Sequence, residues 1–361
     1  MGSRRAWGWR GAALLAAAVA ACGGGSSAGP ASAAPPADPM VGLVSGAWTW
    51  VDFPDSTCDD GSPTGIGVNP GTGPDLLVVL DGGGACWDYL TCFILDTATH
   101  GPFGATEFAA LQAELLGGSI LDRSLPGNPL PDATQVFVPY CTGDIHGGDN
   151  VVAYVGPAET RVYHHVGRRN LVAFLRRLAA TYPAPRRLVV AGSSAGGFGA
   201  LLNYDAFRRT WPASRGYLVD DSGPPFEAGA IPQAELDAWF ASWGLGEVLD
   251  PLCGAACRTG LSAGLAAVES LYPGDRLALL SSLQDQVISG YFLMNGAQFQ
   301  QDLLQLAADV IDPSSNARGF FVSGNTHTML ITPAAFTQGV PLLVWLGQQL
   351  SDDPAWVSRR P

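Results

Sequence analysis

The sequence predicts an α/β fold: a mostly parallel central sheet flanked by helices, with a small helical cap insertion. Three observations point to it. Short continuous apolar runs, such as DLLVVL at 75–80 and LVVA at 188–191, are typical of strands buried on both faces. Segments with helical apolar spacing lie between such runs, as crossover helices do. Glycine-rich or polar loops follow the runs directly, where open α/β sheets bind ligands.

The N-terminal residues indicate export. Arginines precede an apolar stretch that is too short to span a bilayer, which predicts a signal peptide over 1–21. Val-Ala-Ala-Cys then resembles a bacterial lipobox, so we expect Cys22 to be lipidated; the alternative is an ordinary signal peptide cleaved within 31–37. Residues 22–39 are mostly Gly, Ser, Ala and Pro and predict a flexible tether. We therefore expect a cell-envelope lipoprotein or a secreted protein, attached to a membrane only through this anchor.

The remaining segment, residues 40–361, is expected to form a single domain, because it has no internal repeat and no second low-complexity linker. The chain is acidic, with a formal net charge of −13 at pH 7. An acidic surface argues against nucleic acid as a partner, since a polyanion requires a basic surface. We expect a monomer that needs no cofactor.

Six further cysteines, an even number in an exported chain, indicate disulfides and allow 15 connectivities. They are Cys58, Cys86, Cys92, Cys141, Cys253 and Cys257. The last two are close enough in sequence for a local disulfide. Metal binding is the alternative, but no Cys-x-x-Cys pair is present and the histidines do not cluster with cysteines. Disulfides are therefore the better interpretation, and we expect no metal.

The first elements of the domain lead to a glycine cluster. Residues 40–53 alternate as a strand entering the fold does, and 58–73 reads as a turn-dense connection. The buried strand at 75–80 then ends in Asp-Gly-Gly-Gly. Glycines directly after a buried strand let backbone N–H groups turn toward a bound group, so the amides of Gly83 and Gly84 are expected oxyanion donors. A plain glycine-rich turn is the alternative.

The next strand, predicted at 135–140, ends in a loop that concentrates polar side chains. Asp144 and His146 in this loop are expected to line the substrate pocket, because ligands bind at the C-terminal ends of such strands. A metal site and an ordinary solvated loop are the alternatives. Residues 163–180 then show helical apolar spacing and predict the crossover helix that leads into the strand at 188.

The stretch at 188–202, LVVAGSSAGGFGALL, is the most informative part of the sequence. Its apolar front predicts a strand and its small residues and leucines predict a helix, with a G-x-S-x-G pattern between them. In this context the pattern is typical of the nucleophile elbow of α/β-hydrolases, a sharp turn that exposes the serine. Ser194 is therefore the expected nucleophile. The amide of Ala195, at the helix N-terminus, is expected to stabilise negative charge on the substrate.

Three more strands are predicted after the elbow, at 216–219, 276–282 and 319–322. Between the first two, residues 234–257 predict a helical insertion that covers the site. Loops that follow the strands offer candidates for the acid and the base.

These candidates follow the chain order Ser…Asp…His of α/β-hydrolases. His327 follows the last strand, and we expect it to take the proton of Ser194 as the serine attacks an ester carbonyl. Asp285 follows the preceding strand and is expected to hold the imidazole tautomer that accepts this proton. Asp221, one strand earlier, is the alternative acid.

Several blocks together resemble the pectin acetylesterase and Notum-like family of serine carboxylesterases. In this sequence the blocks are CDDGSP at 58–63, LDGGGACW at 80–87, VPYCTGD at 138–144, SSAGG at 193–197 and DSG at 221–223. Asp285 and His327 fall at the family's acid and base positions. The chain departs from the family pattern at Gly84, where tryptophan is common, and at Ser193, where cysteine precedes the nucleophile.

The resemblance implies an α/β-hydrolase that removes O-acyl groups. It also implies two disulfides, Cys58–Cys141 and Cys86–Cys92, and it moves Asp221 from the triad to the pocket wall. Trp87, in the oxyanion block, joins the expected pocket residues on the same ground.

We therefore expect a serine carboxylesterase that hydrolyses O-acyl esters, above all O-acetyl, with an acylated carbohydrate or another small ester as its substrate. Two alternatives remain open at this point. One is a polyester depolymerase or lipase-like esterase, and the other is a non-catalytic surface binding protein on the same scaffold.

Overall fold

The computed structural model describes residues 37–361; side chains at 113–116 are excepted. The predicted signal peptide, Cys22 and nearly all of the tether lie outside the described residues. Within 37–361, no helix is long and apolar enough to cross a bilayer.

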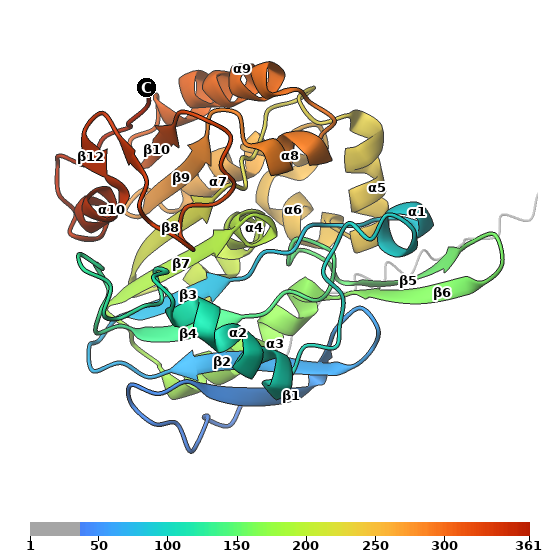
Figure 1. Ribbon diagram of the computed structural model, residues 1–361, viewed down its shortest axis with the longest axis horizontal. Helices are drawn as coiled ribbons and strands as arrows, with labels where there is room; N and C mark the ends of the chain where they lie inside the picture. The colour runs from blue at the N-terminus through green and yellow to red at the C-terminus, as the bar shows by residue number, and fades with distance from the viewer. Residues whose placement is uncertain (1–36) are drawn as a thin grey trace, which may run out of the picture. The chain divides into compact units, whose positions relative to one another are not determined.

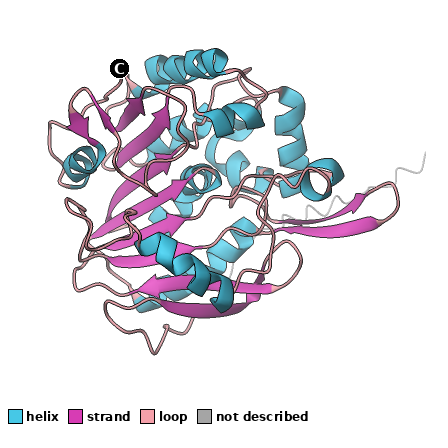
Figure 2. Cartoon of the chain, in the orientation of Figure 1, coloured by secondary structure: helices cyan, strands magenta, loops and turns pink. Residues whose placement is uncertain are grey.

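An eight-stranded sheet forms the centre of the domain (Figures 1 and 2). In spatial order its strands are β1 (Thr49–Thr57), β2 (Pro63–Asn69), β4 (Thr134–Val138), β3 (Leu76–Leu80), β7 (Arg187–Ser193), β8 (Arg215–Asp221), β9 (Arg276–Ser282) and β10 (Ala317–Val322). Only β2 pairs antiparallel with its neighbours, and the six strands from β4 to β10 are parallel. The predicted mostly parallel sheet is thus confirmed.

Helices cover both faces of the sheet (Figure 1). One face carries α2 (Ala105–Leu116) and α10 (Leu342–Leu350), and the other carries α3 (Gly167–Thr181), α4 (Ala195–Thr210) and α7 (Ser262–Leu271). Strand side chains alternate between the two cores: Val78 and Val190 pack on the α3 and α4 side, while Leu77 and Val189 pack on the α2 and α10 side. This two-sided burial explains why the strands are continuous apolar runs.

The predicted helical insertion is present between β8 and β9. It consists of α5 (Gln233–Trp243), α6 (Gly246–Cys253) and the 3₁₀-helix η1 (Gly254–Arg258). Smaller elements complete the chain: α1 (Tyr89–Phe93), β5 (Asn150–Val155), β6 (Thr160–His165), α8 (Gln286–Tyr291), α9 (Gly296–Leu306), the π-helix η2 (Ala307–Ile311), β11 (Phe336–Thr337) and β12 (Val340–Pro341).

The turn-dense interpretation of 58–73 is wrong for its middle, which forms β2. The glycines that suggested turns serve close packing instead. A Cβ on Gly67 would lie 2.3 Å from the ring of Phe108 in α2, and one on Gly65 would lie 2.1 Å from the carbonyl oxygen of Val51. Glycine is therefore what lets this strand pass between its neighbour β1 and the helix.

The helix predicted at 163–180 begins only at Gly167. The preceding residues form β6, which pairs antiparallel with β5 in a hairpin apart from the main sheet (the green hairpin at the right of Figure 1). The amide of Gly167 donates to the buried carboxylate of Asp144 at 2.7 Å, which fixes where the helix starts.

Within residues 37–361 the structure contains three disulfides, Cys58–Cys141, Cys86–Cys92 and Cys253–Cys257. They confirm both the preference for disulfides over metal ligation and the three expected pairings. Cys58–Cys141 joins residues 83 positions apart, from the loop after β1 to the loop after β4. The other two each close a short local loop.

Candidate active site

Ser194 occupies a strained turn between β7 and α4. Its backbone has φ 59° and ψ −123°, a conformation that costs a non-glycine residue about 1–3 kcal/mol and that surrounding structure must hold. The two glycines of the pattern are required by close backbone contacts. A Cβ on Gly192 would lie 2.0 Å from the carbonyl oxygen of Gly196, and one on Gly196 would lie 2.0 Å from that of Leu80. The turn therefore has the geometry of a nucleophile elbow.

His327 and Asp285 form a direct pair. Nδ1 of His327 lies 2.9 Å from Oδ2 and 3.1 Å from Oδ1 of Asp285, whose side chain is fully buried. The same carboxylate accepts hydrogen bonds from the amides of Val287 and Ile288, so it also caps α8. Because an ionised carboxylate only accepts, Nδ1 must donate, which leaves the lone pair of a neutral imidazole on Nε2. This is the form that a general base requires.

The elbow and the loop that carries His327 meet at the end of β8. The carbonyl oxygen of Asp221 accepts from the amide of Ser194 at 2.7 Å. Its carboxylate oxygen Oδ2 accepts from the amides of Met329 and Leu330, both at 2.8 Å. Through this one residue the structure brings the Ser194 turn and the His327 loop together.

The expectation that Asp221 lines the substrate pocket is thereby corrected. Its side chain is fully buried and bonds to loop backbone, so it does not line the cavity beside Ser194. The carboxylate that contacts the His327 ring is that of Asp285, not that of Asp221.

The loop after β3 lies against the elbow. A Cβ on Gly82 would lie 2.7 Å from the carbonyl oxygen of Ser193 and 3.1 Å from Cβ of Ser194. Farther along, the loop pairs with the segment around Ala98, using the carbonyl of Gly83.

The hydrogen bonds between this loop and the segment around Ala98 do not use the amides of Gly83 and Gly84. The amide of Thr99 donates to the Gly83 carbonyl at 2.7 Å, and the amide of Ala85 donates to the Thr97 carbonyl at 3.1 Å. The amides of Gly83 and Gly84 take no part in either bond. Gly84 and Ala195 line the same cavity as Ser194, and Ala195 stands at the N-terminus of α4. The role of these amides as oxyanion donors stays a prediction.

An apolar cavity opens beside Ser194 and contains about 320 Å³ of empty space, its mouth included. Its walls come from the Ser194 turn, the loops after β3 and β4, the helix α5 and the segment of α8. The lining residues are Gly84, Ala85, Ile145, Ser194, Ala195, Phe198, Trp239, Ile288, Tyr291 and Phe292. Sequence reasoning missed the α8 contribution. The signal was available, since these apolar residues directly follow Asp285.

The expected pocket residue Asp144 lies elsewhere. Its fully buried carboxylate accepts from the hydroxyl of Thr142 and from the amides of His146 and Gly167. Burial raises its pKa to about 6, although these hydrogen bonds oppose the shift. The residue holds its loop against the start of α3 and does not reach the cavity.

His146 supports the loop after β3. Its Nε2 lies 2.9 Å from the carbonyl oxygen of Asp81, so this nitrogen donates, and its ring packs against Gly199 of α4. Burial lowers the pKa of His146 to about 4, which keeps the ring neutral. The expectation that His146 lines the cavity is therefore corrected.

Trp87 is half-buried and contacts Trp239, which lines the cavity, but Trp87 does not line the cavity itself. Its ring centroid lies 5.8 Å from that of Trp239 and 6.4 Å from that of Trp243, both in cap helix α5. Its carbonyl oxygen accepts from the hydroxyl of Ser242 at 2.7 Å. Trp87 thus joins the oxyanion segment to the cap rather than contacting the cavity directly.

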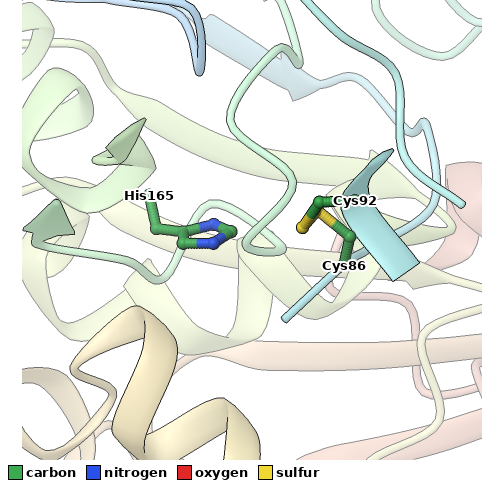
Figure 3. Close-up of side chains that lie close together, drawn as sticks. All are labelled: Cys86, Cys92 and His165. Carbon is green, nitrogen blue, oxygen red and sulfur yellow. A yellow bond between two sulfur atoms is a disulfide. The ribbon is translucent and has the colours of Figure 1, made fainter. Parts of the chain in front are cut away.

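Cys86, Cys92 and His165 gather in a buried group whose sulfur and nitrogen atoms lie within 4.8 Å of one another (Figure 3). The two sulfurs are bonded to each other. Nδ1 of His165 donates to the carbonyl of Thr142 and Nε2 accepts from the hydroxyl of Tyr154, so both ring nitrogens are engaged. Burial lowers the pKa of His165 to about 3. This group supports the loop after β3 and offers no ligand set for a metal.

Comparison with known proteins agrees with this geometry. The family model for pectinacetylesterase matches residues 48–235, just over half of the chain. The chain is similar to the palmitoleoyl-protein carboxylesterase NOTUM of Schmidtea mediterranea, with 32% identity over 166 residues, 44% of this chain and 30% of that protein. It is also similar to the human protein of the same name, with 30% identity over 152 residues, 41% of this chain and 29% of that protein. The aligned segments thus span less than a third of these relatives.

A solved structure extends the likeness in fold to most of the chain. The Wnt deacylase Notum from Drosophila matches with a TM-score of 0.58 at 20% identity, covering 86% of this chain and 95% of that one. The fold is accordingly that of an α/β-hydrolase. Together with the family match over residues 48–235, these observations place the chain in the pectinacetylesterase family.

Proposed function

We propose that this protein is a serine carboxylesterase that hydrolyses short O-acyl esters, above all O-acetyl, through Ser194, His327 and Asp285. One observation carries the proposal: the elbow of Ser194 and the loop of His327 are bonded to the same residue, Asp221, while His327 is paired with Asp285. The family match and the apolar cavity beside Ser194 support an ester substrate.

The proposed reaction proceeds through an acyl-enzyme. Nε2 of His327 takes the proton of Ser194 Oγ as this oxygen attacks the ester carbonyl carbon. The amides of Gly83, Gly84 and Ala195 stabilise the oxyanion, each by roughly 3 kcal/mol. The C–O bond to the alcohol then breaks, and the alcohol leaves with the proton from His327. Water, deprotonated by the same imidazole, attacks the acyl carbon and releases the acid and free Ser194.

Asp285 serves this reaction through the orientation and charge of His327. Its carboxylate holds Nδ1–H and stabilises the imidazolium that forms during each proton transfer. Since Asp285 is fixed by two amides of α8, it orients the ring without having to move.

The cavity favours a short acyl group. Its empty space of about 320 Å³ includes the open mouth, so the enclosed part is smaller, and the rings of Trp239, Tyr291 and Phe292 form its walls. An acetyl group fits such a space, whereas a long chain would have to displace a ring. The alcohol part would be a carbohydrate or another small alcohol at the open mouth.

A longer acyl chain is the second candidate, because the relatives are named palmitoleoyl-protein carboxylesterases and the cavity walls are apolar. A lipase-like esterase or polyester depolymerase belongs to the same class of substrate. Rates on acetyl, butyryl and octanoyl esters of one chromogenic alcohol distinguish the two candidates, with the acetyl ester fastest under the proposal.

Three disulfides support a site of action outside the cytoplasm, where disulfides form and persist. We propose that the protein is exported as a lipoprotein anchored at Cys22, or is released, and that it acts as a monomer. Mass spectrometry of the mature N-terminus decides between the anchored and the released form.

Hydrolysis of a chromogenic acetyl ester by the Ser194→Ala variant tests the proposal. We expect wild-type activity and its loss in the variant by a factor of about 10³ or more. Ser214→Ala is the matched control. Ser214 is also buried, but it lies just before the first residue of β8, whereas the candidate site lies at the last residue of that strand, Asp221. Activity of Ser194→Ala near the wild-type level would contradict the proposal, and an inactive wild type would favour a non-catalytic binding protein.

A further inference from the structure

Asp221, at the end of β8, is bonded to two other segments of the candidate site. Its Oδ2 accepts from the hydroxyl of Ser193 at 2.9 Å and from the amides of Met329 and Leu330 at 2.8 Å. Its carbonyl accepts from the amide of Ser194. This fully buried residue at the end of β8 is thus bonded to Ser193 and Ser194 in the elbow and to the loop that follows His327.

The segments that meet at Asp221 are strained. Ser194 has φ 59°, Ser222 has φ 64° and Thr328 has φ 65°, values that non-glycine residues rarely adopt. The three residues are linked, because Ser194 donates to the Asp221 carbonyl and the amide of Thr328 donates to the hydroxyl of Ser222 at 3.2 Å. Strain of this kind persists only where surrounding bonds hold it, and here they converge on Asp221 and its neighbour.

Hydrogen bonds to the Asp221 carboxyl oppose the effect of its burial. The pKa of this carboxyl is raised above its usual value because burial outweighs the hydrogen bonds from Leu330, Met329 and Ser193. Three donors point at one oxygen, Oδ2, which an ionised carboxylate accepts without conflict. Oδ1 accepts from the hydroxyl of Ser222 at 3.3 Å, so a carboxyl proton on either oxygen would take the place of an accepted hydrogen bond.

We propose that Asp221 is a positioning residue, whose carboxylate sets the place of the His327 loop relative to the Ser194 elbow by bonding Ser193 on one side and Met329 and Leu330 on the other. The inference rests on the proposed function, in which His327 accepts the proton of Ser194. It assigns Asp221 no contact with substrate. The reacting groups remain Ser194, His327 and Asp285.

The adjacent acid provides a matched control. Asp220 is also buried, on the same strand and one residue away, so its side chain points to the other face of the sheet. Its Oδ1 accepts from the amide of Gly223 at 2.9 Å, and burial raises its pKa well above the usual value. Asp220→Asn keeps an acceptor for Gly223 and leaves the bonds of Asp221 intact.

The experiment compares four proteins: wild type, Asp221→Asn, Ser193→Ala and Asp220→Asn. Asparagine at 221 can keep an oxygen in the place of Oδ2, but it removes the charge that strengthens the three bonds to this oxygen. We therefore expect Asp221→Asn to lower kcat for an acetyl ester at least about tenfold, equivalent to ~1.4 kcal/mol in the barrier, with KM changed less than about twofold. Ser193→Ala removes one bond of the three and is expected to lower kcat by a smaller factor. Asp220→Asn is expected to stay within about twofold of wild type in both constants.

Hydrogen exchange supplies a readout that does not depend on activity. We expect the amides of Met329 and Leu330 to be protected in wild type, to exchange at least about tenfold faster in Asp221→Asn and to remain protected in Asp220→Asn. An inactive wild type would overturn the proposed function, and exchange would still test the role of Asp221.

Equal kcat values and equal protection in Asp221→Asn and wild type would overturn the inference. An equal loss of activity in Asp220→Asn and Asp221→Asn would also overturn the inference. The loss would then follow from replacing either buried acid and would not depend on the bonds of Asp221. If Asp221→Asn fails to fold, Ser193→Ala decides. An unchanged kcat in folded Ser193→Ala would contradict the claim that the bond between Ser193 and Asp221 helps to position the His327 loop.

Discussion

Nδ1 of His327 lies 2.9 Å from Oδ2 of Asp285, and the same carboxylate caps α8 through its other oxygen. Under the proposed function Asp285 therefore has two separable tasks, one in the chemistry and one in stability. Asparagine preserves the cap acceptor and removes the charge, whereas alanine removes both. This difference allows the catalytic role of Asp285 to be measured apart from folding.

For Asp285→Asn we predict a fall in kcat of about 10³- to 10⁴-fold with nearly unchanged stability. The amide can still accept from Val287 and Ile288, but its NH₂ faces Nδ1 of His327 and reverses the tautomer that the base needs. For Asp285→Ala we predict a similar loss of kcat and about 1 kcal/mol less stability, because the cap is lost. Ester kinetics and urea unfolding measure the two effects. Equal stability of the two variants would contradict the capping role, and a kcat near wild type would contradict the triad.

Trp239→Ala should shift acyl preference toward longer chains. The ring of Trp239 is a cavity wall, so its removal makes room for methylenes, each worth roughly 0.8 kcal/mol, or about fourfold, when buried. We expect the ratio of kcat/KM for butyryl and acetyl esters to rise at least about fourfold. Phe240→Ala is the control, because Phe240 is the next residue of α5 and packs against the guanidinium of Arg258, with a distance of 4.7 Å to its ring centroid. An equal rise of the butyryl-to-acetyl ratio in both variants would show that the change comes from disruption of the cap helix and not from loss of the Trp239 ring as a cavity wall.

The disulfides should differ in their contribution to stability. In the chain-entropy model, Cys58–Cys141, with a sequence separation of 83, stabilises by roughly 4–5 kcal/mol, and Cys86–Cys92, with a separation of 6, by roughly 2 kcal/mol. We predict that replacing both cysteines of the first pair by serine lowers the free energy of unfolding more than the same change in the second pair. Guanidinium unfolding under oxidising conditions measures the order, and the reverse order would show that local packing around Cys86 outweighs loop closure.

Stability below neutral pH should depend on His146. Its folded pKa is lowered to about 4 by burial, so between about pH 6.5 and pH 4 the unfolded chain binds a proton that the folded chain does not. The unfolding free energy therefore falls as the pH drops through this window, by on the order of 3 kcal/mol for this group alone.

The His146→Gln variant isolates this contribution. Glutamine keeps an N–H for the carbonyl of Asp81 but does not titrate, so we expect a flatter stability curve between pH 6.5 and 4. Asp144 has its pKa raised to about 6, which stabilises the fold as the pH falls from 6 to 3.8, but it is present in both proteins and cancels in the difference. Parallel curves for the two proteins would contradict a neutral His146 in the folded state.

The parts of the fold that the sequence predicted have local causes. The elbow at Ser194, the strand at 276–282 and the cap follow from runs of residues whose pattern determines their own structure. β6 was missed although its partner β5 is close in the sequence, because the apolar spacing of α3 continues backward into β6. Antiparallel pairing in this short hairpin decided the structure of the segment, and helical spacing alone did not reveal it.

The site shows the same limit. Asp285 and His327 were predicted from their order after successive strands, and their pairing is present in the structure. Asp144 and Asp221 also follow strands, but their oxygens are taken by loop amides. Sequence position cannot distinguish a polar side chain that faces a pocket from one that bonds to the loops around the pocket. The difference depends on which backbone N–H groups from other parts of the chain lie next to that side chain.

The identity of the serine that forms the covalent intermediate tests the central claim most directly. Wild-type protein is treated with a fluorophosphonate, which reacts with activated serines, and the adduct is located by mass spectrometry of its peptides. We predict one adduct, on Ser194, with labelling slowed at least about 10³-fold in His327→Ala and unaffected in Ser214→Ala. An adduct on another residue, or ester hydrolysis without any adduct on Ser194, would contradict the account.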